Sequence, residues 1–123
     1  MIVAISSTGT SLDSNVDARF GRCPYFIFYD TDTDRFDSID NQSRDSMEGA
    51  GIQTAQMVAN RGAKAIITGN VGPNAFRVLS TAGLKIYSGA SGKVSEAIEK
   101  LKSGQLTETS SPDVGSHFGM GRQ

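Results

Sequence analysis

The chain has 123 residues, a common length for one domain, and a chain of this size needs neither a disulfide nor a metal to fold. Twelve Lys and Arg against thirteen Asp and Glu give a net charge of −1, which argues against nucleic acid or an anionic membrane as a partner. The single cysteine cannot form an internal disulfide and fits a reducing cytosol. No apolar run approaches the about 20 residues of a membrane span. Residues 1–5 lack a signal-peptide pattern, so we expect a cytoplasmic protein.

The first 40 residues predict three strands. Residues 1–5 are continuously apolar, which is typical of a central strand covered on both faces. Residues 25–30 are rich in aromatic and β-branched side chains and predict a second, buried strand. After a turn at residues 31–34, residues 35–40 predict a weaker third strand. The last two strands are expected to form an antiparallel hairpin at one edge of a sheet.

The second half alternates helix and strand, with helices at about residues 49–61, 73–82 and 94–103 and strands at residues 63–68 and 84–87. This alternation implies parallel strands joined by right-handed crossovers. The predicted fold class is therefore three-layer α/β, a mixed five-stranded sheet with helices on both faces. We assign residues 1–106 to this single domain and residues 107–123 to a flexible, Gly-rich tail that holds the only histidine, His117. We also expect the chain after Gly104 to be removable without loss of the fold.

The segment at residues 19–26 holds the only cysteine, Cys23, at the start of the second strand. A soft thiolate beside two cations, Arg19 and Arg22, and a flexible Gly21 suits a soft anionic ligand. In that case Cys23 is exposed and the two arginines lower its pKa. The alternative is that Cys23 is a small hydrophobe packed in the core, as free cysteines often are.

Four glycine-containing segments follow predicted strands or precede helices, at residues 6–11, 49–51, 69–73 and 88–92. Ligands of open α/β sheets bind beyond the carboxyl ends of the strands, and helix N–H groups favour anions there. We expect these segments to collect at one site, although the glycines could also serve only to turn the chain. There is no Walker or Gly-x-Gly-x-x-Gly nucleotide fingerprint, no catalytic constellation, and no acidic residue in the first strand for nuclease chemistry.

The motif Phe20-Gly21-Arg22-x-Pro24-x-Phe26 resembles the Phe-Gly-Arg-x-Pro-x-Phe signature of the dinitrogenase iron–molybdenum cofactor biosynthesis family. That family includes nitrogenase cofactor carriers, the C-terminal domain of the cofactor synthase and small stand-alone proteins. The resemblance covers about residues 1–106 and continues in order through residues 49–51, 66–75, 83–87 and 95–98. It implies a ribonuclease H-like arrangement. Some carriers have a histidine directly before the Phe-Gly pair, where this chain has Arg19, so one proposed ligand is missing.

The resemblance implies a non-enzymatic carrier of an iron–sulfur or iron–molybdenum cluster, or of its precursor, in metallocluster biosynthesis related to nitrogen fixation. Its partners would be the cluster and cluster-assembly proteins, and the chain would be a monomer or weak dimer. An anion- or nucleotide-binding regulatory module and a protein–protein adaptor stay open as alternatives. The expected metal ligands are Cys23 and His117. The predicted cofactor-binding residues are Arg19, Phe20, Gly21, Arg22, Cys23, Gly49, Gly51, Gly69, Asn70, Gly72 and Gly89.

Overall fold

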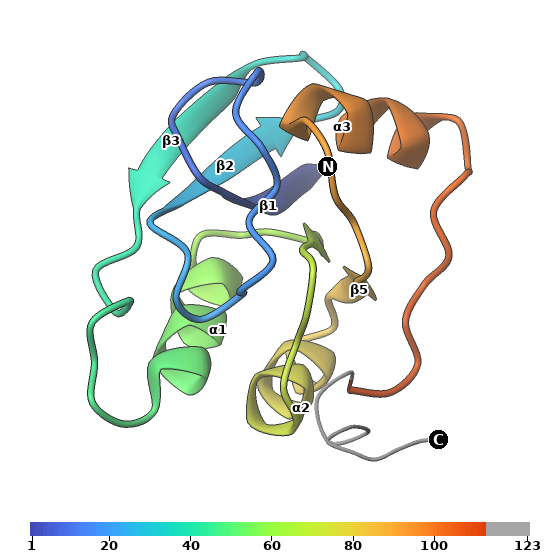
Figure 1. Cartoon of the computed structure of the whole chain (residues 1–123). Helices are drawn as coiled ribbons and strands as arrows, with labels where there is room; N and C mark the ends of the chain where they lie inside the picture. The colour runs from blue at the N-terminus through green and yellow to red at the C-terminus, as the bar shows by residue number, and fades with distance from the viewer. Residues whose placement is uncertain (113–123) are drawn as a thin grey trace.

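A computed structural model describes residues 1–112, which form a mixed five-stranded sheet in the order β3-β2-β1-β4-β5 (Figure 1). β1 pairs with β2 antiparallel and with β4 parallel, β2 pairs with β3 antiparallel, and β4 pairs with β5 parallel. The predicted fold class is confirmed in its elements and layers, whereas the ribonuclease H-like assignment stays a prediction. The elements are β1 (Ile2–Ser7), β2 (Tyr25–Asp30), β3 (Phe36–Asp40), α1 (Ala50–Asn60), β4 (Ala65–Ile67), α2 (Pro73–Thr81), β5 (Lys85–Tyr87) and α3 (Val94–Lys102).

The strand positions follow from the apolar content of each strand. β1 lies at the centre of the sheet, and its residues from Val3 onward are buried because both of its faces are covered. β3 lies at one edge and exposes most of its residues, as the weak apolar pattern predicts.

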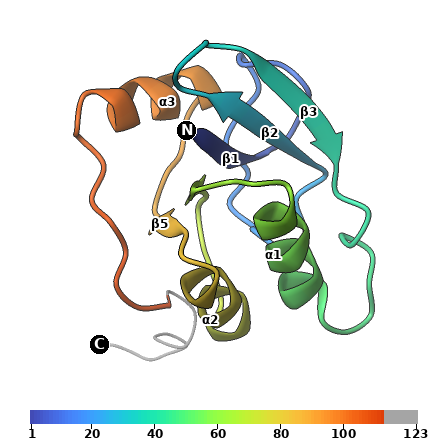
Figure 2. The same cartoon turned by 180° about the vertical axis from the view of Figure 1, so that it is seen from behind.

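Helices cover both faces of the sheet, with α1 and α2 on one face and α3 on the other (Figures 1 and 2). Because side chains alternate along a strand, Phe26 and Phe28 of β2 pack toward α1 and α2. Ile27 and Tyr29 of the same strand pack toward α3. The two apolar cores therefore share one sheet and are separated by it.

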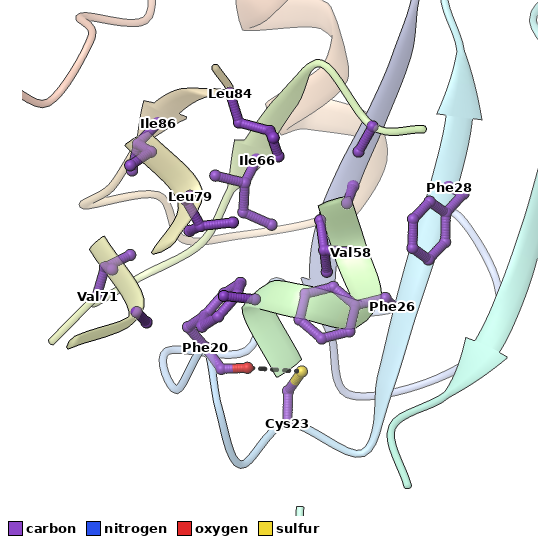
Figure 3. Close-up of a cluster of buried hydrophobic side chains, with 14 residues drawn as sticks. Phe20, Cys23, Phe26, Phe28, Val58, Ile66, Val71, Leu79, Leu84 and Ile86 are labelled. Atoms are coloured by element: carbon purple, nitrogen blue, oxygen red, sulfur yellow. Dashed lines mark hydrogen bonds between the residues drawn. The ribbon is translucent and has the colours of Figure 1, made fainter. Parts of the chain in front are cut away.

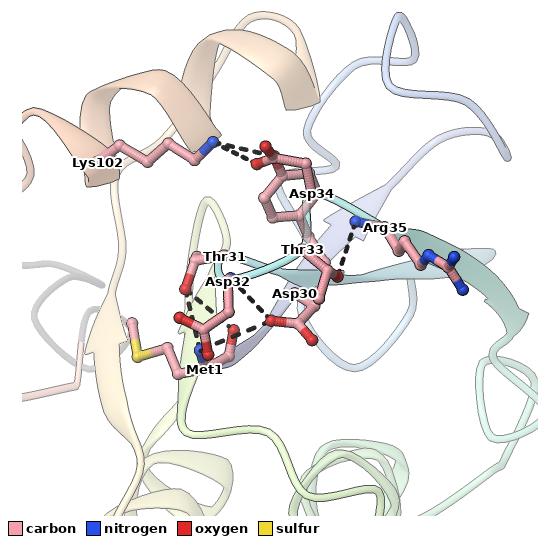
Figure 4. Close-up of polar contacts among 9 residues, drawn as sticks. Met1, Asp30, Thr31, Asp32, Thr33, Asp34, Arg35 and Lys102 are labelled. Atoms are coloured by element: carbon pink, nitrogen blue, oxygen red, sulfur yellow. Dashed lines mark hydrogen bonds and ion pairs between the residues drawn. The ribbon is translucent and has the colours of Figure 1, made fainter.

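On the α3 side, a polar cluster ties the end of the helix to the β2–β3 turn (Figure 4). Lys102 Nζ donates to Asp34 Oδ1 at 2.6 Å and to the Tyr29 hydroxyl at 3.1 Å, while the Tyr29 hydroxyl also donates to Asp34. The hydrogen bond from Lys102 lowers the pKa of Asp34 below its usual value. The same figure shows the amino group of Met1 bound by the turn, where it donates to Asp32 Oδ2 at 3.0 Å.

The chain after α3 does not leave the domain at once. Leu106 packs against the α3-side core, and the Thr109 N–H donates to the Ile86 carbonyl at 2.7 Å. The Ser88 N–H donates to Thr109 Oγ1 at 2.9 Å. These residues therefore cover the outer edge of β5. That the fold survives removal of the chain after Gly104 stays a prediction. The rest of the predicted tail, including His117, lies outside the described residues.

No helix within residues 1–112 is both long enough and apolar enough to cross a membrane.

Candidate functional site

A pocket of about 510 Å³ opens between residues 18–22 and the first turns of α1 and α2. It lies at the end of the sheet where β4 ends and β2 begins. Eight of the predicted cofactor-binding residues line it: Arg19, Phe20, Gly21, Arg22, Gly49, Gly51, Asn70 and Gly72. The predicted segments at residues 49–51 and 69–73 also contain the lining residues Ala50 and Pro73, whereas sequence reasoning missed Ala18, Ile52, Asn74 and Ala75. Asn74 had a usable signal, because it stands in the first turn of a predicted helix.

Close backbone contacts hold the segment at residues 18–22 against its neighbours. The Asn70 N–H donates to the Ala18 carbonyl at 2.8 Å, and a Cβ on Gly69 would lie 2.5 Å from the Ala18 Cα. A Cβ on Gly21 would lie 3.0 Å from the Gly51 Cα at the start of α1. These two glycines are therefore required by the close approach of backbones. Gly69 does not line the pocket but packs against Ala18, which does.

A buried amide holds the same segment from below. Asn41 is 1% exposed, and its Nδ2 donates to the Gly21 carbonyl at 3.2 Å and to the Cys23 carbonyl at 2.9 Å. Its Oδ1 accepts from Thr54 Oγ1 of α1 at 3.3 Å. Asn41 thus connects the pocket segment to α1 and satisfies carbonyls that packing hides from water. Its position in a polar stretch of sequence gave no sign of this role.

The two arginines of the segment have different partners. Arg19 forms a two-point pair with the buried Asp17, from Nε to Oδ1 and from Nη2 to Oδ2, each at 3.1 Å. Burial would raise the pKa of Asp17, but the hydrogen bonds and charge of Arg19 outweigh it and hold that pKa below its usual value. Arg22 Nη1 donates to the carbonyls of Arg44 at 2.8 Å and Ser46 at 2.6 Å.

Among residues 1–112, Arg19 Nη1 therefore has no hydrogen-bond partner. Arg22 Nη1, by contrast, is hydrogen-bonded to the loop before α1.

Cys23 lies in the core, where Figure 3 shows its sulfur beside the Phe20 carbonyl. The side chain is 0% exposed, and its Sγ contacts the Phe20 carbonyl at 3.4 Å. Burial, together with the charge of Asp17, raises the pKa of Cys23 to about 12. The expectation of an exposed cysteine with a lowered pKa is wrong, because both guanidinium groups bind other partners and the thiol is desolvated. Cys23 does not line the pocket.

The three helix starts differ in how their N–H groups are used. The Val94 and Ser95 N–H groups at the start of α3 donate to the carbonyls of Ser14 at 2.8 Å and Leu12 at 2.9 Å. We call this helix start closed, because these N–H groups already have acceptors within the protein. Glu96 Oε1 accepts from the Lys93 N–H at 3.0 Å. Within residues 1–112, by contrast, no side chain caps α1 at Gly49 or α2 at Gly72, and neither first turn carries an acidic residue.

The segments at residues 6–11 and 88–92 do not line the pocket. The Gly89 N–H donates to the Gly69 carbonyl at 2.7 Å. Gly89 therefore contacts a residue next to the pocket lining and does not line the pocket itself. Of the four glycine-containing segments, those at residues 49–51 and 69–73 contribute to the lining of this pocket. The loop at residues 12–16 pairs with residues 92–95 and covers the start of α3.

Among the described residues, no group of three or more His, Cys, Asp and Glu side chains could hold a metal ion. The hydrogen-bond donors at the pocket are instead Arg19, the side-chain amide of Asn74 and backbone N–H groups at two helix starts, whereas the N–H and the Nδ2 of Asn70 both donate to the Ala18 carbonyl. Such donors favour an anion.

The fold and the site together define a class of protein. It is a three-layer α/β domain with an anion-favouring pocket beside two open helix starts. The chain belongs to the dinitrogenase iron-molybdenum cofactor family, whose sequence pattern matches residues 1–104.

Two solved structures and one further protein sequence are similar to this chain and support the same assignment. The apo form of the orange protein from Desulfovibrio gigas is 36% identical, with a TM-score of 0.89 over 91% of this chain and 95% of that one. A candidate NifB protein from Thermotoga is 40% identical, with a TM-score of 0.76 over 87% of this chain and 91% of that one. An uncharacterised protein of Methanocaldococcus jannaschii is 30% identical over 108 residues, which are 85% of this chain and 92% of that protein.

Proposed function

We propose that the protein is a non-enzymatic carrier that binds an anionic iron–sulfur or iron–molybdenum cluster, or its precursor, in the pocket between α1 and α2. The observation that carries the proposal is the convergence of two uncapped helix starts and Arg19 on one cavity. Its volume of about 510 Å³ falls in the usual range for small-ligand sites. Membership of the iron-molybdenum cofactor family supports a metallocluster as the anion.

The cluster would bind as a preformed anion and not through a protein thiolate. The only sulfur ligand that was expected, Cys23, is buried and protonated at neutral pH. Hydrogen bonds from backbone N–H groups and from Arg19 would hold the sulfide or oxide atoms on the outside of the cluster. Binding without covalent attachment suits a carrier, because the cluster can then be released whole to cluster-assembly proteins in the cytoplasm.

A second candidate uses the same donors. A regulatory module that binds a small oxyanion or the phosphate of a nucleotide is favoured by the absence of a metal-ligand group among the described residues. The two candidates differ in whether metal stays with the protein.

The test is anaerobic reconstitution with iron and sulfide, followed by desalting and by measurement of iron per chain and the visible absorption spectrum. Wild type should retain a cluster, and Arg19→Ala should lower its affinity about tenfold or more because it removes a charged donor. Arg35→Ala is the matched control, since it makes the same charge change outside the pocket.

Cys23→Ser tests the mode of binding and should still take up the cluster. A folded Cys23→Ser protein that takes up none would show that the thiolate is a ligand after all. Wild type that retains no iron, yet binds phosphate or a nucleotide, would replace the carrier with the regulatory module.

A further inference from the structure

Four glycines line the pocket, and the fold explains two of them. Gly21 needs its missing side chain because a Cβ would lie 3.0 Å from the Gly51 Cα. Gly49 has φ of 72°, a left-handed conformation that other residues rarely adopt.

The fold does not explain Gly72. Its φ of −77° and ψ of 171° suit any residue, and an added Cβ would meet nothing within 4 Å. The equivalent position at the start of α3 is Lys93, which has nearly the same conformation, with φ of −76° and ψ of 149°. Serine, aspartate or asparagine stabilises a helix somewhat more than glycine at such a position, because the side-chain oxygen caps the helix.

Gly51 is the second unexplained glycine. It lies in the first turn of α1, where alanine is the better helix former. An added Cβ would lie 3.5 Å from the Ala75 Cβ of α2, which is an ordinary contact. At both positions the chain leaves out a side chain that helix stability would favour, and both positions face the same cavity.

We infer that Gly51 and Gly72 determine which ligands the pocket accepts, by keeping the backbone of both helix starts bare. A ligand can then contact the N–H groups of α1 and α2 at the same time. The class this selects is a compact anion with hydrogen-bond acceptors on opposite sides, such as an oxometallate or a metal–sulfide cluster. This inference rests on the proposed function, because it assumes that the pocket is the ligand site.

Three variants test it. Gly72→Ser places a capping oxygen where the ligand would accept hydrogen bonds, and Gly51→Ala narrows the gap between the helices. Lys93→Ser is the matched control, since it introduces the same side chain at the helix start outside the pocket. The probes are molybdate, followed by backbone amide chemical shifts, and the iron–sulfide reconstitution described above, followed by iron content.

The two pocket variants should melt at or above the wild-type temperature and bind each probe at least about tenfold more weakly. The control should bind as wild type does. In wild type, molybdate should shift the amide signals of Asn74 and Ala75 at the start of α2, and of Gly51 and Ile52 in α1.

The outcomes separate this inference from the proposed function. If wild type loads the cluster and both pocket variants load it equally well, the inference is wrong and the carrier function stands. If wild type binds molybdate at these amides but retains no cluster, and the variants lose molybdate, the carrier function is wrong and the inference stands. Pocket variants that melt well below wild type would show that the glycines serve the fold, and wild type that binds neither probe would overturn both proposals.

Discussion

The two faces of the sheet carry the same kind of unit, a strand followed by a loop and a helix, and yet they end in different surfaces. On the α3 face, the carbonyls of Leu12 and Ser14 and the carboxylate of Glu96 take up the N–H groups around the helix start. On the other face, α1 and α2 begin at glycines that no side chain within residues 1–112 caps, and a cavity opens between them. A helix start after a glycine-rich loop is therefore not a site by itself, because the packing of distant loops decides whether its N–H groups are available.

The faces also differ in what lies beneath the surface. Under the pocket, the buried Asn41 and Thr54 bind the carbonyls of the segment that forms the pocket wall. On the α3 face, the end of the helix is instead held to the β2–β3 turn by the hydrogen bonds of Lys102 with Tyr29 and Asp34. We expect substitutions under the pocket to disturb both stability and binding, and substitutions at the α3 start to disturb stability alone.

The largest effect should come from Asn41→Ala. It leaves the Cys23 carbonyl without its side-chain donor and removes one of the two donors to the Gly21 carbonyl, which should cost about 2 kcal/mol of unfolding free energy. Because Gly21 belongs to the pocket wall, cluster uptake should fall as well. Urea unfolding and the iron assay measure the two effects. Asn60→Ala, at an exposed position on α1, is the control and should stay within about 0.5 kcal/mol of wild type. An equally small effect of Asn41→Ala would mean that water replaces the amide.

An intermediate effect is expected from Cys23 at alkaline pH. Its pKa is raised in the folded state, from 9.0 to about 12, so the unfolded chain loses this proton first as the pH rises. Folding stability from the neutral thiol is therefore complete below pH 9 and is lost as the pH rises toward 12.

Between pH 9 and about pH 10.5, wild type should lose about 1–2 kcal/mol relative to Cys23→Ala, in which the other titrating groups are unchanged. Denaturant unfolding at several pH values measures the difference. At neutral pH the native thiol should react with iodoacetamide far more slowly than in unfolded protein. A stability difference that is flat with pH, or fast alkylation of the native protein, would contradict the buried thiol.

The smallest effect should come from Glu96→Ala on the closed face. The Lys93 N–H loses its acceptor, which should cost about 0.5–1 kcal/mol. No new anion site should appear, because the carbonyls of Ser14 and Leu12 still hold the next two N–H groups. Molybdate titration followed by amide shifts checks this, and Glu99→Ala on the same helix is the control. New molybdate binding at α3 would show that a freed helix start is sufficient, and would weaken the comparison of the two faces.

Much of the fold could be predicted, because the sequence patterns that indicate it are local. The strand at residues 25–30 and the helix α3 each carry a complete apolar pattern within a few residues, and β3 shows its edge position by lacking one. The contact of Thr109 with β5 could not be predicted, because it is a single contact in a polar stretch. The candidate site was predicted in part, since short motifs named eight of its lining residues but not Asn74 or the support from Asn41.

By itself, the amino-acid sequence determined the order of the elements, the mixed sheet, the family and the three segments that meet at the pocket. Those features depend on periodicity and on motifs, which are properties of neighbouring residues. Only the tertiary structure decided that Cys23 is buried, that Arg22 binds the loop before α1, and that α3 is closed while α1 and α2 are open. Each of those outcomes depends on partners far away along the chain, such as the residues 18 positions from Cys23 and 22 positions from Arg22. Burial and hydrogen bonding are set by which surfaces meet in the folded chain, and no local pattern records that.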